Sequence, residues 1–465
     1  MMVKKLLLTL STIIVFAFLL SIMGCAGIIP PNGGPKDTIP PVLVTSLPKD
    51  SALNVKTQKL TLTFDEFVDI KDISENVIFS PLQVKSPIID HSLKNITIKF
   101  RDTLQPNTTY SIDFGHAIRD INEGNILKNF SYVFSTGDKL AMGKMEGKVK
   151  LAETGTVDSS LIVILHKSTD DSAIYKKTPI YIAKLNGSGE FKFNYIQPGK
   201  YNAYVLPNDY SKKYDDSTKL FGFLDSMVNI TKETQQVSIY AYQEFKKKDK
   251  PKQVNTSVKP TKEEKKLKYS TSLDGIKQDL LSSLKLTFSK PLRTFDSTKI
   301  ILCDSFYTPL TTATVHLDTS KTMASINYNW LENSYFKLLV LKESAIDTSG
   351  IQLLKGDTLS FTTKNNKEYG SIKIKFSNLN LSKHPVLQIV SGDKIEESIV
   401  LKDNTIKRKL FKPGDYSIRL LLDANHNGVW DAGSYKKRIQ PEIVLDKNWK
   451  MSVKADWDNE TEIRL

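Results

Sequence analysis

Short runs of alternating apolar and polar residues dominate the chain after its N-terminal segment. Every second residue is large and apolar in residues 60–64, 96–100, 110–114 and 132–134. Alternation with a period of two indicates β-strands that bury one face. Turn residues such as Pro106 and Asn107 separate the runs. The spacing predicts an antiparallel β-sandwich, and no stretch has the period of a long amphipathic helix.

A second pattern follows Gly143. It contains a Gly-x-Phe run at residues 189–191 and a Pro-Gly-x-Tyr turn at residues 198–201. A Pro-Gly turn between two strands that carry aromatic residues is a hairpin signal. We therefore predict that this part of the chain forms another small β-sandwich.

Both patterns occur twice. Residues 60–64 recur as 284–288, residues 96–100 as 326–330, residues 117–120 as 345–347, residues 132–136 as 359–363, and the turn 197–201 as 412–416. The repeated order predicts two copies of a two-module unit.

The first module of each copy resembles the bacterial Ig-like domain found in surface-layer and Bacteroidetes lipoproteins. The resemblance rests on Pro40-Pro41, the strand ending in Phe64, the strand at 107–110 and the closing Phe134-Ser135-Thr136. The second module is similar to the prealbumin-like fold of carboxypeptidase regulatory domains through its Gly-x-Phe strand and Pro-Gly-x-Tyr turn. These resemblances imply an all-β fold of tandem, internally duplicated Ig-like and prealbumin-like sandwiches. Both families are mostly structural or binding modules, and a fold alone does not establish a function.

The patterns predict boundaries along the whole chain. They are a signal peptide at 1–24, a Pro/Gly tether at 25–37, an Ig-like domain at 38–137 (module A), a prealbumin-like sandwich at 138–245 (module B), a disordered basic linker at 246–268, a degenerate second Ig-like domain at 269–365 (module A′) and a second prealbumin-like sandwich at 366–465 (module B′). The linker has almost no apolar residues with which to fold. A basic stripe for lipid contact is the alternative interpretation.

The N-terminus carries an export signal. Lys4 and Lys5 precede an apolar run at 6–20, and Gly24-Cys25 follows. The segment resembles a bacterial lipobox, which implies that Cys25 carries a diacylglycerol group and becomes the mature N-terminus. A plain transmembrane anchor is the alternative, because the run is about as long as the shortest spanning helices. Ala26 in place of an aspartate implies sorting to the outer membrane, and the absence of acidic residues just after it favours the periplasmic face over the cell surface.

The charge of the chain bears on which partners it can bind, and its cysteine content bears on how it is stabilised. The formal net charge is +14, but the lysines are scattered and the chain is exported, so nucleic acid is not an expected partner. We expect an ordinary solvated basic surface, and attraction to anionic lipid headgroups or polysaccharide is the alternative. The only cysteine besides Cys25 is Cys303, which we expect to be buried in a strand.

One loop in module B′ has the pattern of a calcium site. EF-hand-type loops place oxygen ligands at positions one, three, five, seven and nine. Here these are Asp423, Asn425, Asn427, the Val429 carbonyl and Asp431. Position twelve is Ser434 instead of a bidentate glutamate, so the alternative is an Asx-rich turn that holds itself. Calcium is the candidate ion, and no cofactor is otherwise required.

In the first copy, the residues that align with Asp423, Asn425 and Asn427 are Pro207, Asp209 and Ser211. We therefore expect the first copy to form a loop at the same place that lacks most of the calcium-binding side chains. The difference favours a structural role for the loop over catalysis.

The chain shows no catalytic constellation that would define an enzyme. The six histidines are isolated in sequence and are expected on the surface or in turns: His91, His116, His166, His316, His384 and His426. We therefore expect a non-catalytic, lipid-anchored envelope protein, an interaction or accessory subunit of an outer-membrane complex with a protein partner. A surface glycan-binding or adhesion module is the alternative, and it would need exposed aromatic rings.

Overall fold

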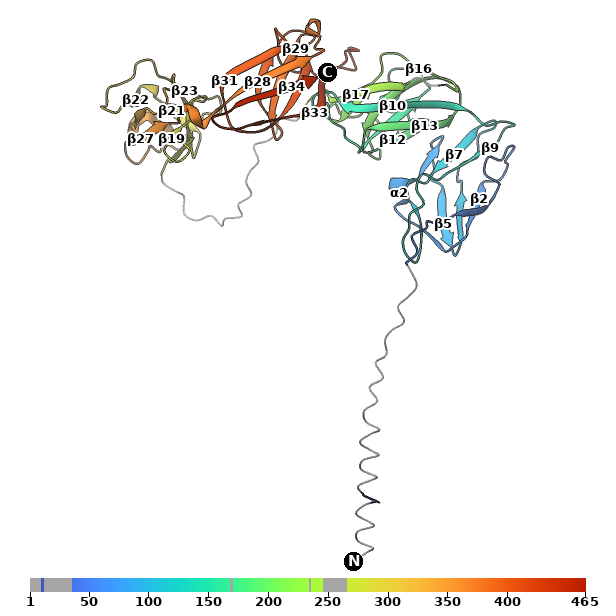
Figure 1. Cartoon of the computed structure of the whole chain (residues 1–465). Helices are drawn as coiled ribbons and strands as arrows, with labels where there is room; N and C mark the ends of the chain where they lie inside the picture. Colours follow the sequence, from blue (N-terminus) through green and yellow to red (C-terminus); the bar gives the residue numbers. More distant parts are fainter. Residues whose placement is uncertain (1–9, 12–35, 168–169, 234–235, 246–265) are drawn as a thin grey trace, which may run out of the picture. The chain divides into compact units, whose positions relative to one another are not determined.

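The computed structural model describes residues 10–11, 36–167, 170–233, 236–245 and 266–465 (Figure 1). Strands make up 49% of the described residues and helices 5%, which confirms the all-β prediction. The helices α2 (Ile73–Asn76) and α3 (Ala173–Lys176) each span a single turn. Nowhere in the described ranges is a helix long and apolar enough to cross a membrane. The chain divides into two compact units, residues 1–140 and 141–465.

The first unit contains module A. One antiparallel sheet has the order β1-β2-β6-β5, a second has the order β4-β7-β9, and β3 pairs with β8. The strands are β1 (Leu43–Leu47), β2 (Lys59–Phe64), β3 (Val68–Ile70), β4 (Ile78–Ser80), β5 (Ile88–Ser92), β6 (Asn95–Lys99), β7 (Thr109–Asp113), β8 (Ile118–Asp120) and β9 (Ser131–Ser135). The core joins Leu60 and Ile98 of the first sheet to Tyr110 and Phe134 of the second. The alternating apolar positions therefore mark the inner faces of the sheets, as predicted.

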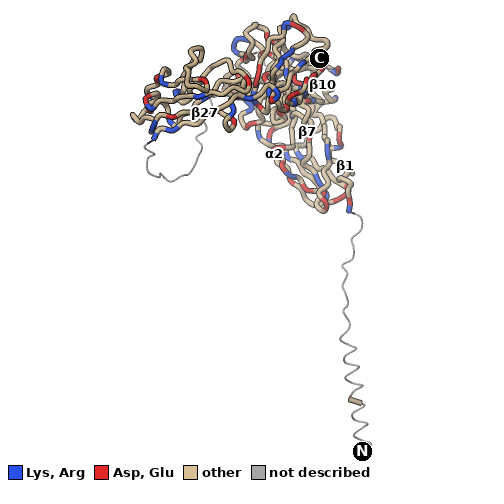
Figure 2. Tube along the Cα trace, turned by 60° about the vertical axis from the view of Figure 1, so that its left-hand side comes forward, with Lys and Arg blue, Asp and Glu red and all other residues tan. Residues whose placement is uncertain are grey.

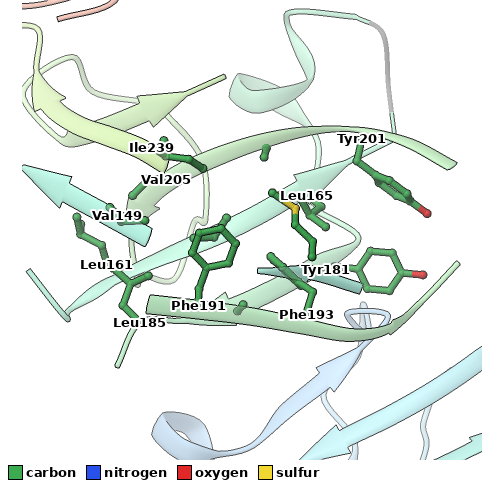
Figure 3. Close-up of a cluster of buried hydrophobic side chains, with 14 of the residues drawn as sticks. Val149, Leu161, Leu165, Tyr181, Leu185, Phe191, Phe193, Tyr201, Val205 and Ile239 are labelled. Carbon is green, nitrogen blue, oxygen red and sulfur yellow. The ribbon is translucent and has the colours of Figure 1, made fainter. Parts of the chain in front are cut away.

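Module B begins the second unit. Its sheet has the order β12-β11-β14-β15-β17-β10-β13, and β16 also pairs with β14. The strands are β10 (Gly143–Leu151), β11 (Leu161–His166), β12 (Tyr181–Lys184), β13 (Glu190–Ile196), β14 (Gly199–Pro207), β15 (Leu220–Phe223), β16 (Val228–Ile230) and β17 (Gln236–Gln243). Side chains from several strands meet in the core that Figure 3 shows, among them Leu165, Phe191, Tyr201 and Ile239. Every residue of β11 is buried, so this strand is covered on both faces.

Module A′ repeats the topology of module A. The sheet β18-β20-β24-β23 matches β1-β2-β6-β5, the sheet β19-β27-β25-β22 contains the second layer, and β21 pairs with β26. The strands are β18 (Tyr269–Thr271), β19 (Lys277–Gln278), β20 (Leu284–Phe288), β21 (Leu292–Phe295), β22 (Ile300–Asp304), β23 (Thr314–Leu317), β24 (Met323–Asn327), β25 (Tyr335–Val340), β26 (Ala345–Asp347) and β27 (Asp357–Thr363). Short 3₁₀ turns η1 (Ser297–Lys299) and η2 (Lys342–Ser344) precede β22 and β26.

The predicted register of one repeated strand was wrong by one pair of residues. Leu284 pairs with Ile326 in A′, whereas Leu60 pairs with Ile98 in A. The equivalent of Ile326 is therefore Ile98 and not Ile96. A shift by two residues keeps the same face buried, so alternation alone could not detect it.

The predicted linker 246–268 extends too far. Leu267 is buried in the A′ core and forms a β-bridge with Leu353, and the Lys268 amide donates to Ser289 Oγ. Leu267 is an apolar residue at the end of a polar segment. Because it is buried in the A′ core, Leu267 and Lys268 belong to the module and not to the linker. Residues 246–265 lie outside the described residues.

Module B′ repeats module B. The sheet β30-β29-β32-β33 faces the sheet β31-β28-β34 across one core. The strands are β28 (Gly370–Ser377), β29 (Pro385–Ser391), β30 (Lys394–Val400), β31 (Thr405–Phe411), β32 (Gly414–Leu422), β33 (Ile443–Val453) and β34 (Asp458–Arg464), with 3₁₀ turns η3 (Asn366–Glu368) and η4 (Leu381–Lys383). The two Pro-Gly-x-Tyr turns are alike: Tyr201 donates to the Gln197 carbonyl at 2.8 Å, and Tyr416 donates to the Lys412 carbonyl at 3.0 Å.

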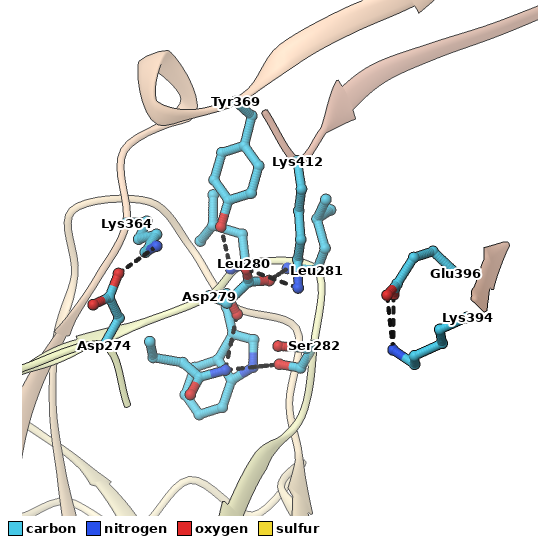
Figure 4. Close-up of polar contacts among 12 residues, drawn as sticks. Asp274, Asp279, Leu280, Leu281, Ser282, Lys364, Tyr369, Lys394, Glu396 and Lys412 are labelled. Atoms are coloured by element: carbon cyan, nitrogen blue, oxygen red, sulfur yellow. Dashed lines mark hydrogen bonds and ion pairs between the residues drawn. The ribbon is translucent and has the colours of Figure 1, made fainter. Parts of the chain in front are cut away.

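Polar contacts join A′ to B′ (Figure 4). The Leu280 amide donates to the Tyr369 hydroxyl at 2.7 Å, and Lys412 pairs with Asp279 at 3.1 Å. Burial raises the pKa of Tyr369 to about 12, so its hydroxyl stays neutral at physiological pH. Figure 2 shows Lys and Arg interspersed with Asp and Glu along the described chain. The net positive charge is therefore spread over the modules.

Candidate functional site

The candidate site is the long loop between β32 and β33 of module B′. Strand β32 ends at Leu422 and β33 begins at Ile443, so the predicted calcium residues all lie in this connection. Asp423 directly follows the strand and is 1% exposed. A carboxylate buried this deeply requires hydrogen-bond donors around it.

The loop supplies those donors from its own backbone. Asp423 Oδ1 accepts from the His426 amide and Oδ2 from the Gly428 amide, each at 2.7 Å. Gly428 has φ +79°, a conformation that glycine adopts without strain. Asp423 therefore holds the turn closed in the manner of an Asx turn.

The other predicted ligands close the loop from its opposite side. Asn425 and Asn427 each donate an amide hydrogen bond to Asp431 Oδ2, at 2.7 and 2.6 Å. The Asn427 Oδ1 atom accepts from the Val429 amide at 2.8 Å, and the Val429 side chain is exposed. The structure thus gathers Asp423, Asn425, Asn427 and Asp431 in one loop.

Within the described ranges, no group of three or more His, Cys, Asp or Glu side chains is placed to hold a metal ion. A calcium site here would depend on two carboxylates and on amide or carbonyl oxygens. The calcium interpretation stays a prediction.

Module B contains a related loop that is closed by a lysine side chain. Asp209 accepts from the Lys212 amide three residues later, as Asp423 does from His426. The Lys219 ammonium pairs with both Asp209 and Asp215 at 2.5 Å. The predicted alignment of Pro207 with Asp423 was wrong, because Pro207 and Leu422 occupy the same place at the ends of paired strands. The hydrogen-bond pattern makes Asp209 the counterpart of Asp423.

A pocket of about 510 Å³ opens beside the loop of B′. His384 and His426 line it, their rings lie 3.5 Å apart, centroid to centroid, and both residues are exposed. The buried Glu442 accepts from the Ala424 amide at 2.8 Å and the Asp431 amide at 3.1 Å. The two acids that line the pocket, Asp423 and Glu442, thus accept hydrogen bonds that fix the loop, whereas the exposed His384 and His426 line the same pocket.

One prediction about a histidine was wrong, and one pairing was not foreseen. His384 and His426 lie in exposed loops, as predicted, and these loops meet at one end of the β29-β32 strand pair. His166, expected on the surface or in a turn, is buried at the end of β11 next to Tyr204. Burial and the charge of Lys177 lower the pKa of His166 to about 4. Sequence spacing could not reveal either placement, because both depend on long-range strand pairing.

The structure tests the prediction for one of the two cysteines. Cys303 is buried in β22, as predicted, and burial raises the pKa of its thiol. Cys25, the predicted lipidation site, lies outside the described residues, and the lipidation remains a prediction.

Comparison with known proteins defines the class of the first module. Residues 37–136 match the family described as "Bacterial Ig-like domain", which confirms the Ig-like interpretation of module A. No curated protein matches the chain. Similar solved structures include the Bacillus anthracis TIE protein, with 10% identity over 94% of this chain and 76% of that one at a TM-score of 0.17. The major pilin subunit BcpA of Bacillus cereus shares 9% identity over 69% of this chain and 99% of its own, at a TM-score of 0.16.

A third similar structure is the N-terminal part of the bacterial S-layer protein SbsC. It shares 13% identity over 44% of each chain, at a TM-score of 0.16. The family match, and not these distant likenesses, carries the assignment of module A.

Proposed function

We propose that this protein is a non-catalytic binding protein of the cell envelope. It is held at the outer membrane by lipid on Cys25 and serves as an interaction or accessory subunit of a membrane complex. The lipid anchor rests on the sequence of the export signal. The binding role rests on the surface of module A, which follows the predicted tether.

The observation that supports a protein partner is the edge strand β1. It lies at the end of its sheet, and Val44 and Leu47 are 65% and 75% exposed. Val44 lies at an irregularity in the pairing with β2. An uncharged edge strand with exposed aliphatic side chains can receive a strand from another protein. Soluble proteins usually protect such edges with charge, so this exposed edge favours a binding surface.

The experiment is mild crosslinking in native membranes, followed by affinity purification of the tagged full-length protein. A stoichiometric membrane partner is expected with the wild type and is expected to be lost with Val44→Lys. The matched control is Val84→Lys, which adds the same charge at a valine that is even more exposed in the same module. Equal recovery of the partner by both variants would remove β1 from the proposal.

Exposed aromatic rings on module A′ favour a second candidate, a glycan-binding role. Phe306 is 86% exposed and Tyr335 is 69% exposed. Asp304 fixes the loop that carries Phe306 by accepting from the amides of Phe306 and Thr308, at 2.8 and 2.9 Å. Beside them, the Lys337 ammonium lies 3.6 Å from the centroid of the Tyr307 ring. Rigid, solvent-facing rings provide apolar faces on which a sugar can stack.

This candidate is tested by binding of the full chain to a glycan array. Tyr335→Ala is expected to reduce any signal about tenfold or more, the effect typical of a ring at a binding hot spot. Tyr210→Ala, which truncates a fully exposed tyrosine in module B, is the control. Binding that is unaffected by Tyr335→Ala would place the glycan elsewhere.

A structural calcium ion in the Asp423 loop is also part of the proposal. Its support is the ammonium of Lys219, which bridges two carboxylates in the related loop of module B. Module B′ has carboxylates at both ends of its loop, Asp423 and Asp431. A bound cation would stabilise this loop without taking part in catalysis.

A further inference from the structure

A segment of module B′ packs against module B. This docking segment, residues 433–444, follows the Asp423 loop and leads into β33. Tyr435 at its start is only 3% exposed, although it belongs to a loop. Its ring contacts the rings of Phe221 and Phe223, each at 5.1 Å between centroids, and its hydroxyl lies 3.0 Å from that of Tyr204. All three partners belong to module B.

Polar contacts surround the buried tyrosine. Ser434 Oγ donates to Glu244 at 2.7 Å, and Gln440 Nε2 donates to Asp225 at 2.8 Å. The Arg438 guanidinium pairs with Asp171 and stacks over the Tyr435 ring at 4.6 Å. A central aromatic anchor with arginine and polar contacts around it is the usual anatomy of a binding hot spot.

The backbones also meet closely. The Val444 amide donates to the Ala152 carbonyl at 2.8 Å. A Cβ atom added to Gly155 would lie 2.6 Å from the Val444 carbonyl oxygen, and one added to Gly433 would lie 2.8 Å from Tyr242 Cζ. Both positions therefore accept only glycine in this arrangement.

The docking segment packs against the outer face of the sheet that contains β11. Alternating residues of β11 face the core of module B, yet Ile162 and Ile164 on the other face are buried as well. The same outer face carries Tyr204, which contacts Tyr435. Burial of a sheet on both faces requires a cover, and here module B′ contributes to it.

We infer that modules B and B′ form a non-covalent clamp through the docking segment, which holds the two halves of the chain together independently of the covalent connection at 246–265. The partner that this surface recognises is the chain's own B module. Module A′ is then an insertion between two modules that bind each other.

The test places a protease recognition sequence in residues 246–265 of the full chain and cleaves it under native conditions. The two fragments are expected to co-elute in size-exclusion chromatography at micromolar concentration. The double variant Tyr435→Ala/Arg438→Ala is expected to weaken their association about 100-fold or more, so that the fragments separate after cleavage. Tyr210→Ala is the control and should leave the fragments together.

Two results of this experiment would overturn the clamp. One is separation of the wild-type fragments after cleavage. The other is co-elution of the fragments of the double variant, because the docking segment would then not be what holds them together. An uncut wild-type chain that elutes at twice its mass, while the uncut double variant elutes at its own mass, would overturn it too, because B′ would then bind module B of a second copy. Tyr435→Phe keeps the ring and guards against misfolding: its fragments should stay together with a modestly weaker association.

Discussion

Tyr204 and Tyr435 meet hydroxyl to hydroxyl at 3.0 Å although 231 residues separate them in the chain. The Tyr435 hydroxyl also lies 3.3 Å from the Asp171 carbonyl oxygen, so it has two hydrogen-bond partners in module B. Burial and the hydrogen bond to Tyr204 raise the pKa of Tyr435 above its ordinary range, so its hydroxyl stays neutral. The pair joins the first copy of the duplicated unit to the second.

Truncating this pair should destabilise the B–B′ junction in graded steps. Tyr435→Ala removes a buried ring and should cost about 3–5 kcal/mol, whereas Tyr435→Phe removes one hydrogen bond and should cost about 1 kcal/mol. Differential scanning calorimetry of the full chain is the measurement. We expect the alanine variant to lower the melting temperature of the B and B′ transitions more than the phenylalanine variant does. Equal melting of all three proteins would contradict a contribution from Tyr435.

The sequence predicts the strands well because alternation reports directly on which face is buried. The order of the repeated modules also follows from sequence, and buried capping residues support it: Asp120 and Asp347 each accept from backbone amides of the loop that follows. The alignment of individual strand residues between the two copies cannot be predicted from sequence, because residues two apart in a strand lie on the same face. Only the strand pairing distinguished Ile98 from Ile96.

The docking segment was not predicted, because its anchor is a single tyrosine within a polar loop. A signal was nevertheless present in residues 161–165, which are apolar without interruption. Such a run is typical of a strand covered on both faces. It indicates that something covers the sheet, but it does not identify the cover. The His384–His426 pair likewise depends on two loops that only tertiary structure brings together.

Protonation of His166 should destabilise module B in mild acid. Its folded pKa of about 4 lies below the ordinary value of 6.5, so the unfolded state binds more protons between these two pH values. Stability is therefore complete above about pH 6.5 and falls by about 1.4 kcal/mol per pH unit as the pH drops towards 4. His166→Phe should flatten the decrease in melting temperature between pH 7 and pH 5.

The control for this prediction is His316→Phe, at an exposed position on β23. It should leave the pH dependence of the wild type intact. A steep acid dependence that persists in His166→Phe would assign it to other groups.

Calcium should stabilise module B′ if the Asp423 loop binds it. A free concentration tenfold above the dissociation constant would add about 1.4 kcal/mol. The melting temperature of the full chain should rise with millimolar calcium chloride and fall with a chelator. Asp431→Asn removes one ligand charge and should abolish this shift, whereas Asp215→Asn in the related loop of module B should retain it. An unchanged melting temperature in the wild type would leave the loop as a turn held by its own hydrogen bonds.

Labelling of Cys25 with lipid distinguishes a lipid anchor from a transmembrane anchor. Cells grown with labelled palmitate should incorporate the label into the wild type and into Cys303→Ser, and should not label Cys25→Ser. Cys303 is a suitable control because it is a buried cysteine in β22, away from the N-terminus in sequence. Mass spectrometry should find the wild-type chain beginning at Cys25. A wild-type chain that carries no label and keeps residues 1–24 would instead favour the transmembrane anchor, since the apolar run at 6–20 would then remain on the mature protein.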